Sequence, residues 1–253
     1  MRERHASQLT ALDGTAVSSL REWATEIEAW PAGSHVWGHY AEATADGPAI
    51  CRTENVSACH AGVAALVDGV LRDVASDAIG EPGVAFKDKI NYKQPGGAGF
   101  RPHQDRVAYP GVTSVMSILV ALDECTTESG CLWLAGGVDE VLATDDRGVV
   151  REDIARTLSW SAVELAPGGA VCIDGLTPHY SDANRTARPR RVLVASYAPE
   201  RERYTRTQYY AARQDAMTHS SARDGRFRIS TLADFDGAEV APDAAAAERC
   251  THG

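Results

Sequence analysis

The stretch from residue 84 to about residue 197 most constrains the fold, because short apolar runs are separated throughout by glycine, proline and aspartate. The longest run is VTSVMSILVAL over residues 112–122, whose length and composition are typical of a buried strand. Residues 192–197 are apolar at nearly every position, which predicts a strand buried on both faces. A block of many short strands favours an antiparallel double-sheet jelly roll.

Helical patterns flank this block on both sides. Residues 16–30 carry apolar side chains at helical spacing, and residues 57–78 predict a second helix that the Gly80-Glu81-Pro82-Gly83 segment ends. Residues 201–216 predict a surface helix, and we expect the tail from residue 238 to residue 253 to be mobile.

Together these patterns predict one domain over residues 1–253. Its expected parts are a helical segment over residues 1–82, a jelly-roll core over about residues 83–200 and a helical or mobile segment over residues 201–253. The fold class is therefore mainly β with flanking helices. The length is sufficient for a core of this size.

The composition restricts the classes of partner and the cellular location that we expect. The formal net charge of −10 argues against nucleic acid or an anionic membrane as the partner, which leaves a small molecule. No apolar run is long enough to span a membrane, and we find no signal-peptide segment at the N-terminus. The six cysteines form no C-x-x-C pair, so we expect reduced thiols in a cytoplasmic protein. Abundant arginine and alanine favour a bacterial source, and the oligomeric state stays open.

The triplet His103-Gln104-Asp105 and the distant His179 carry the donors of a metal site. A histidine and a carboxylate two residues apart on a strand point to the same face, so both can bind one ion. A second histidine from a distant strand completes a two-histidine, one-carboxylate face, which suits non-haem Fe(II) with open positions. An H-x-D triplet alone is more often a surface hydrogen bond, but the strand and turn signals around it favour the metal.

Several motifs resemble those of the phytanoyl-CoA dioxygenase family of Fe(II)- and 2-oxoglutarate-dependent oxygenases. The matching pieces are His103-Gln104-Asp105, Ser129-Gly130-Cys131-Leu132, Pro167-Gly168-Gly169 and the segment from Pro178-His179 to Arg190. Within the family, residues 51–55 and 87–93 look most like 2-aminoethylphosphonate dioxygenase-like members. The resemblance covers roughly residues 50–212. One departure is Ala135-Gly136-Gly137-Val138, where the family often has Pro-Gly-Ser-His, so a role for that serine and histidine is in doubt.

The resemblance implies a cupin-like, double-stranded β-helix core with iron bound by His103, Asp105 and His179. The open positions would take 2-oxoglutarate and O₂, with release of succinate and CO₂. We therefore expect a dioxygenase that hydroxylates a small polar metabolite, with an anionic or phosphonate-type compound favoured. The same residues would serve desaturation or cyclisation in natural-product biosynthesis. A non-catalytic jelly-roll binding protein and a cupin-type isomerase or lyase with another metal are the alternatives from other classes.

Arg190, eleven residues after His179, is the expected partner of the distal carboxylate of 2-oxoglutarate, since a guanidinium binds a carboxylate through two N–H donors. A hairpin turn within residues 182–187 would place positions 179 and 190 opposite one another on one sheet face. Arg191 has the wrong parity and Arg188 lies nearer the turn. A solvated arginine cluster is the alternative, and Ser181 is a second candidate for the carboxylate.

All three lysines of the chain lie within residues 87–93, although the chain has 22 arginines. On a strand, one face would carry Lys87, Lys89, Asn91 and Lys93, and the other face Phe86, Asp88, Ile90 and Tyr92. The polar face either meets water or lines the pocket mouth. In the second case the resemblance favours Asn91 near the C1 carboxylate of 2-oxoglutarate, and Lys87 or Lys89 would bind an anionic substrate.

The remaining polar candidates are weaker. Arg52 is a candidate substrate contact at the pocket mouth, with a surface ion pair to Glu54 as an equally good interpretation. The histidines away from the triplet are interpreted as structural or surface residues: His35, His39, His60, His219 and His252.

Overall fold

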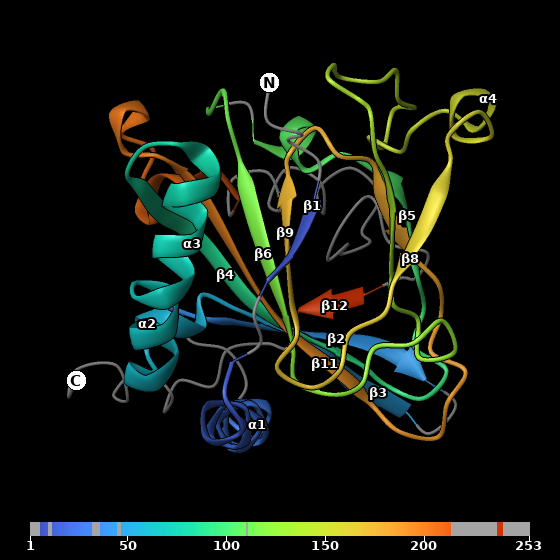
Figure 1. Ribbon diagram of the computed structural model, residues 1–253. Coiled ribbons are helices and arrows are strands. Elements are labelled where there is room, and N and C mark those ends of the chain that lie inside the picture. Colours follow the sequence, from blue (N-terminus) through green and yellow to red (C-terminus); the bar gives the residue numbers. More distant parts are fainter. Residues whose placement is uncertain are drawn as a thin grey trace.

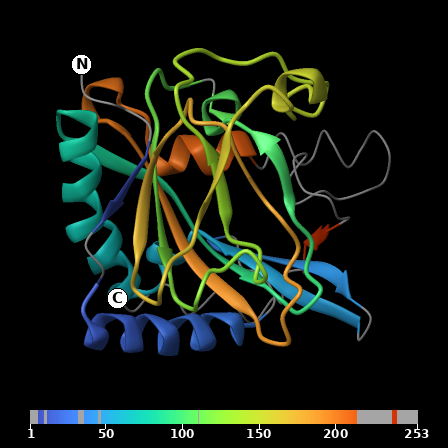
Figure 2. The same ribbon diagram turned by 45° about the vertical axis from the view of Figure 1, so that its right-hand side comes forward.

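Two antiparallel sheets face one another in the computed structural model, with helices on the outer side of the larger sheet (Figure 1, Figure 2). The structure describes residues 6–9, 12–31, 36–44, 47–109, 111–213 and 237–239. This arrangement confirms the predicted jelly roll. Eight of the polar residues that the sequence singled out line a cavity between the sheets.

The larger sheet has eight strands in the order β1-β9-β6-β11-β4-β3-β2-β12. In that order the strands are Ala6–Leu9, Ala170–Asp174, Met116–Ala121, Arg190–Pro199, Gly83–Lys93, Gly47–Glu54, Gly38–Thr44 and Gly237–Glu239. The smaller sheet has the order β5-β10-β7-β8. Its strands are Phe100–His103, His179–Ser181, Leu132–Ala135 and Trp160–Val163.

Strand β11 lies in the centre of the larger sheet, between β4 and β6. Leu193 and Tyr197 on one face join the core under the helices, whereas Val192 on the other face packs in the core near the smaller sheet. The prediction of a strand buried on both faces is therefore confirmed. Its central place makes β11 the support of both cores.

Helices cover the outer face of the larger sheet. The α-helices are α1 (Gly14–Glu28), α2 (Ala61–Val67), α3 (Val70–Ile79), the short α4 (Glu152–Ala155) and residues 206–213. The 3₁₀ turns are η1 (Val56–Ala58), η2 (Asp105–Ala108) and η3 (Glu200–Glu202). Helix α1 begins after Asp13, whose side chain accepts a hydrogen bond from the Ala16 amide at 2.8 Å. Apolar residues of α1, α2 and α3 pack on the sheet, which matches the helical spacing in the sequence.

Two expectations for the N-terminal part are wrong. Residues 1–82 are not purely helical, because β2 and β3 extend the larger sheet. The helix expected over residues 57–78 is divided into η1, α2 and α3, with Gly69 at the N-terminus of α3. A Cβ at Gly69 would lie 2.4 Å from the Ala65 carbonyl oxygen, so this close approach requires glycine. The break turns Val70 outward, where it is 47% exposed.

The C-terminal part is described only in part, and one cysteine differs from the expectation. Residues 206–213 are helical, but the rest of the helix expected up to residue 216 and the tail from residue 240 lie outside the described residues. The first residues of that tail form part of β12. Four cysteines are free thiols, whereas Cys59 is disulfide-bonded, so the expectation of reduced thiols is wrong at that position. The single domain stays a prediction.

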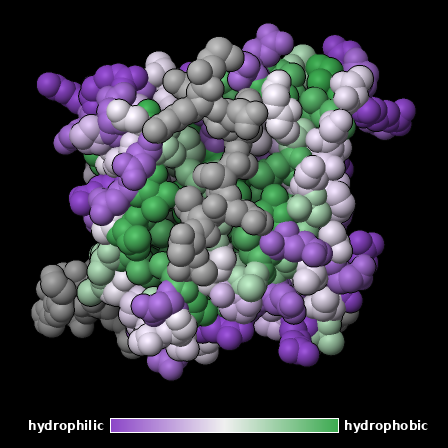
Figure 3. All heavy atoms as spheres, in the orientation of Figure 1, coloured by the Kyte–Doolittle hydropathy of each residue, from purple (hydrophilic) through white to green (hydrophobic). Residues whose placement is uncertain are grey.

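Hydrophilic residues project at the edges of the face seen in Figure 3, and hydrophobic residues gather toward its middle. In the described part of the chain, no helix combines the length and the apolar character that a membrane span requires.

Candidate active site

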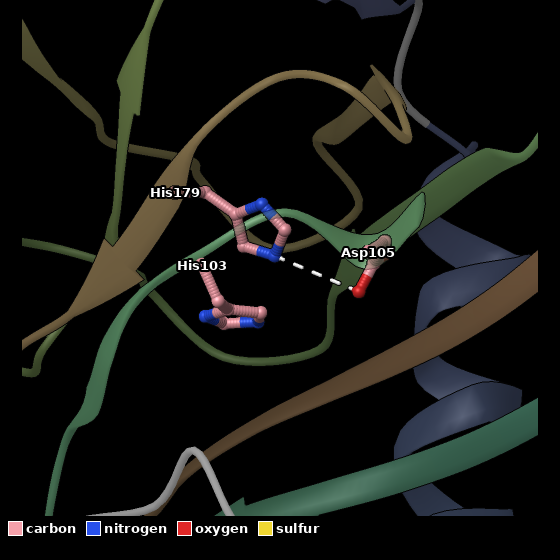
Figure 4. A group of neighbouring side chains, drawn as sticks. All are labelled: His103, Asp105 and His179. Carbon is pink, nitrogen blue, oxygen red and sulfur yellow. Dashed lines mark ion pairs between the residues drawn. The ribbon is translucent and has the colours of Figure 1, made fainter. Parts of the chain in front are cut away.

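The three predicted metal ligands, His103, Asp105 and His179, come together in the structure (Figure 4). His103 is the last residue of β5 and His179 the first of β10, and these two residues are paired across the strands. Their ring centroids are 4.2 Å apart, and His179 Nε2 lies 3.8 Å from Asp105 Oδ1. One donor atom from each of the three residues lies within 4.8 Å of the others. This is the grouping that the sequence predicted.

The route by which Asp105 reaches the group differs from the prediction. Asp105 is not on the strand of His103, because β5 ends at His103 and Asp105 begins the 3₁₀ turn η2. Asp105 does lie beside the two histidines, but the prediction that it does so by strand alternation is wrong. Gln104 between them is 1% exposed. Its amide donates to the Glu140 carbonyl at 2.9 Å and accepts from the Leu142 amide at 2.8 Å, which holds this turn in place.

Backbone carbonyls orient both histidine rings. His103 Nδ1 lies 2.6 Å from the Arg101 carbonyl oxygen, and His179 Nδ1 lies 3.0 Å from the Thr177 carbonyl oxygen. Because a carbonyl oxygen only accepts, each Nδ1 carries the hydrogen and each Nε2 keeps its lone pair for a ligand. Burial, together with the neighbouring His179, lowers the pKa of His103 to about 3, so its imidazole is neutral at physiological pH.

The carboxylate of Asp105 is ionised, and one of its oxygens is directed at the histidines. Burial favours the protonated acid, but the neighbouring histidines outweigh it and hold the pKa of Asp105 below its usual range. Ser117 Oγ donates to Asp105 Oδ2 at 2.7 Å, and Ser196 Oγ lies 3.1 Å from Ser117 Oγ. Oδ1 is thus the atom left to face the histidines. Two imidazole nitrogens with free lone pairs and an ionised carboxylate fit a divalent iron ion.

A cavity of about 110 Å³ lies between the sheets next to the triad. Its walls carry the triad and five of the other predicted site residues: Arg52, Lys89, Asn91, Ser181 and Arg190. Lys87 is not among the lining residues. Its Nζ is 2.7 Å from the Tyr109 hydroxyl and lies against the Tyr109 and Tyr209 rings. The structure therefore does not place Lys87 for the predicted contact with the substrate.

Arg190 reaches the cavity by a different geometry from the one expected. Strand β10 belongs to the smaller sheet and β11 to the larger, so positions 179 and 190 are not partners in one hairpin. Both residues line the cavity. Arg191 instead binds Asp123 at 2.8 Å, and Arg188 is exposed. Of these three arginines, only Arg190 is placed for a ligand in the cavity.

Arg52 and Glu54 form a buried pair and not the surface pair considered from the sequence. They are 4% and 1% exposed, and Arg52 Nη1 lies 3.2 Å from Glu54 Oε1. Arg52 Nε also donates to Asn91 Oδ1 at 3.1 Å. Arg213 lies 2.6 Å from the second oxygen of Glu54. Burial would raise the pKa of Glu54, but Arg213 and Arg52 lower it to about 2.

The sequence alone did not indicate the roles of three residues of the site. Ser117 orients Asp105, Arg213 binds Glu54, and Lys93 is a buried residue of the cavity wall. The parity of Lys93 with Asn91 was the only available signal.

Strand β4 has a bulge near Lys87, which places Phe86 beside Tyr109. Phe86 therefore does not share the face of Ile90, as the strand alternation had predicted. A bulge adds one residue and reverses the alternation.

The remaining histidines follow the structural interpretation where they are described. His39 is buried and its Nδ1 lies 2.9 Å from Thr53 Oγ1. His60 Nδ1 accepts from the Val63 amide at 3.1 Å and caps α2. His35, His219 and His252 lie outside the described residues.

Comparison with known proteins gives consistent relatives. The sequence model of the phytanoyl-CoA dioxygenase (PhyH) family matches residues 9–192. The chain is 36% identical to methylphosphonate hydroxylase of Gimesia maris, over 89% of this chain and 88% of that protein. It is 32% identical to 2-aminoethylphosphonate dioxygenase of an uncultured bacterium, over 84% of both chains.

A solved structure supports the fold. The crystal structure of EctD from S. alaskensis with 2-oxoglutarate and 5-hydroxyectoine superimposes with a TM-score of 0.66 at 23% identity, over 78% of this chain and 73% of that one. The family match and the site geometry agree on the class of chemistry. The chain therefore belongs to the phytanoyl-CoA dioxygenase (PhyH) family and is an Fe(II)- and 2-oxoglutarate-dependent dioxygenase.

Proposed function

We propose that this dioxygenase hydroxylates a small phosphonate or a similar anionic metabolite, and that Lys89 is the main contact to its anionic group. The observation that carries the proposal is the environment of Lys89. This side chain lines the cavity beside the triad, and within the described residues its Nζ has no hydrogen-bond or ion-pair partner. Burial, together with the neighbouring Arg52 and Lys87, lowers the pKa of Lys89, and an anionic ligand beside it would favour the charged ammonium.

The charges near Lys89 strengthen the argument. Lys89 and Glu54 are cross-strand partners, and Arg52 pairs with Asn91 on the same two strands. The cations around this end are Arg52, Lys87, Lys89 and Arg213. The carboxylates described there are Glu54, which already binds two arginines, and the metal ligand Asp105. The excess of positive charge suits a phosphonate. Relatives named for methylphosphonate and 2-aminoethylphosphonate are in accord with this chemistry.

His103, Asp105 and His179 would hold Fe(II), and 2-oxoglutarate and O₂ would be the co-substrates of the reaction. Fe(II), when bound, supplies the oxygen chemistry that oxidises the substrate while 2-oxoglutarate becomes succinate and CO₂. The protein orients and encloses the reactants. Arg190 and Ser181 would bind the distal carboxylate. Asn91 accepts from Arg52 through its oxygen, so its NH₂ group is left to donate to the C1 carboxylate.

The test is succinate release coupled to oxidation of candidate substrates. Methylphosphonate and 2-aminoethylphosphonate are compared with their neutral analogues in the unmodified enzyme and in Lys89→Met. Loss of a charge-assisted contact should raise the KM for the phosphonate at least about tenfold. The matched control is Arg72→Met, which removes an exposed cation of α3 that does not line the cavity. Preferred turnover of a neutral substrate, or an unchanged KM in Lys89→Met, would refute the proposal.

A further inference from the structure

Two cations lie side by side at the end of the cavity assigned to the distal carboxylate. Lys93 on β4 and Arg190 on β11 are cross-strand partners and are 5% and 6% exposed. In the part of the chain that the structure describes, neither forms an ion pair with a carboxylate, and Arg190 Nε has no hydrogen-bond partner. Burial and the neighbouring Arg190 lower the pKa of Lys93, because two buried charges of the same sign are unfavourable unless an anion neutralises them. The arrangement therefore points to an anionic ligand.

The contacts of Lys93 show how it acts on its neighbours. Its Nζ donates to Ser181 Oγ at 2.9 Å, to the Gly130 carbonyl at 3.3 Å and to the Asp182 carbonyl. Arg190 Nη2 donates to the same Gly130 carbonyl at 2.6 Å. Because an ammonium only donates, the Ser181 oxygen accepts from Lys93, and the Ser181 hydroxyl hydrogen must be directed elsewhere. Ser181 lines the cavity, where a ligand carboxylate would accept it.

Glycine at position 130 makes room for this cluster. Gly130 has φ +72°, and a Cβ there would lie 2.9 Å from Lys93 Nζ and 2.3 Å from the Asp182 carbonyl oxygen. Any other residue would force the backbone of Asp182 away and crowd the ammonium. The Ser129-Gly130-Cys131 motif thus supplies the shared acceptor and the space for the two cations.

We propose that Lys93 is a positioning residue of the 2-oxoglutarate subsite, which fixes Ser181 and the carbonyl that holds Arg190 and which makes the subsite selective for a ligand with a distal carboxylate. The inference rests on the proposed function, in which Arg190 and Ser181 bind that carboxylate. Lys93 donates through all three of its hydrogens to protein acceptors. It therefore contributes its charge and its hold on Ser181, and Arg190 supplies the direct bidentate contact.

The affinities for two ligands are compared, so that a loss of carboxylate recognition is distinguished from a general loss of binding. Binding of 2-oxoglutarate and of 2-oxopentanoate, the same keto acid without the distal carboxylate, is measured by calorimetry on the anaerobic Fe(II)-loaded enzyme. Lys93→Met should weaken 2-oxoglutarate binding at least about tenfold, and 2-oxopentanoate binding by less than about twofold. Arg72→Met is the control and should leave both affinities unchanged. Lys93→Arg, which keeps the charge, should recover part of the 2-oxoglutarate affinity.

The outcomes are distinguishable. If the unmodified protein does not bind 2-oxoglutarate, the proposed function fails. If it binds 2-oxoglutarate and Lys93→Met keeps the affinity, or loses both ligands equally, the role of Lys93 is refuted while the proposed function stands. Should Lys93→Met not fold, Lys93→Gln provides the test, because it retains a donor to Ser181 and loses the charge. A ligand-specific loss in that variant supports the proposal, and equal affinities overturn it.

Discussion

Replacement of Glu54 by glutamine should destabilise the protein in a pH-dependent way. Glu54 is 1% exposed between Arg52 and Arg213, and these arginines lower its pKa from 4.5 to about 2. A shift of this size corresponds to about 3 kcal/mol of stability at neutral pH, at about 1.4 kcal/mol for each pKa unit. Since the folded pKa is the lower one, this stability is present above about pH 4.5 and is lost as the pH falls toward 2.

The assay is urea denaturation of both proteins between pH 7 and pH 2.5. The unmodified protein should lose free energy of unfolding below about pH 4.5, and Glu54→Gln should lack this part of the decline. The difference between the two proteins is therefore about 3 kcal/mol at pH 7 and shrinks as the pH approaches 2. Glu128→Gln is the control, because Glu128 is 70% exposed in its pair with Arg185. A difference that stays constant with pH would refute the assignment of Glu54 as a buried, ionised carboxylate.

Three further predictions concern the site. Arg190→Ala should raise the 2-oxoglutarate concentration for half-maximal succinate release at least about tenfold, while the exposed Arg188→Ala should not; the reverse result would exclude Arg190 as the anchor. Ser117→Ala removes the hydrogen bond to Asp105 Oδ2 and should weaken Fe(II) binding about 10- to 100-fold in a metal titration. An unchanged affinity would show that Ser117 does not orient Asp105 for metal binding. Related halogenases replace the carboxylate ligand with a small residue, so the enzyme with Asp105 should form no chlorinated product in chloride, as mass spectrometry of the products would show.

The sequence predicted the members of the site better than their geometry. The types and order of His103, Asp105 and His179 sufficed, because few other residues offer metal donors next to strand signals. Strand alternation failed at Asp105 and Phe86, where a 3₁₀ turn and a bulge interrupt the regular period. The 182–187 turn connects two different sheets, which chain spacing alone does not reveal. Arg213 and Ser117 were missed since their partners come from distant segments.

The central claim is that this enzyme oxidises a phosphonate-type substrate while 2-oxoglutarate is converted to succinate and CO₂. The most direct measurement uses isotopically labelled O₂ with Fe(II), 2-oxoglutarate and methylphosphonate, and follows label in both products by mass spectrometry. We predict one labelled oxygen atom in succinate and one in the hydroxylated phosphonate, with both products absent for Asp105→Ala. Product without succinate, or undiminished turnover in Asp105→Ala, would contradict the account.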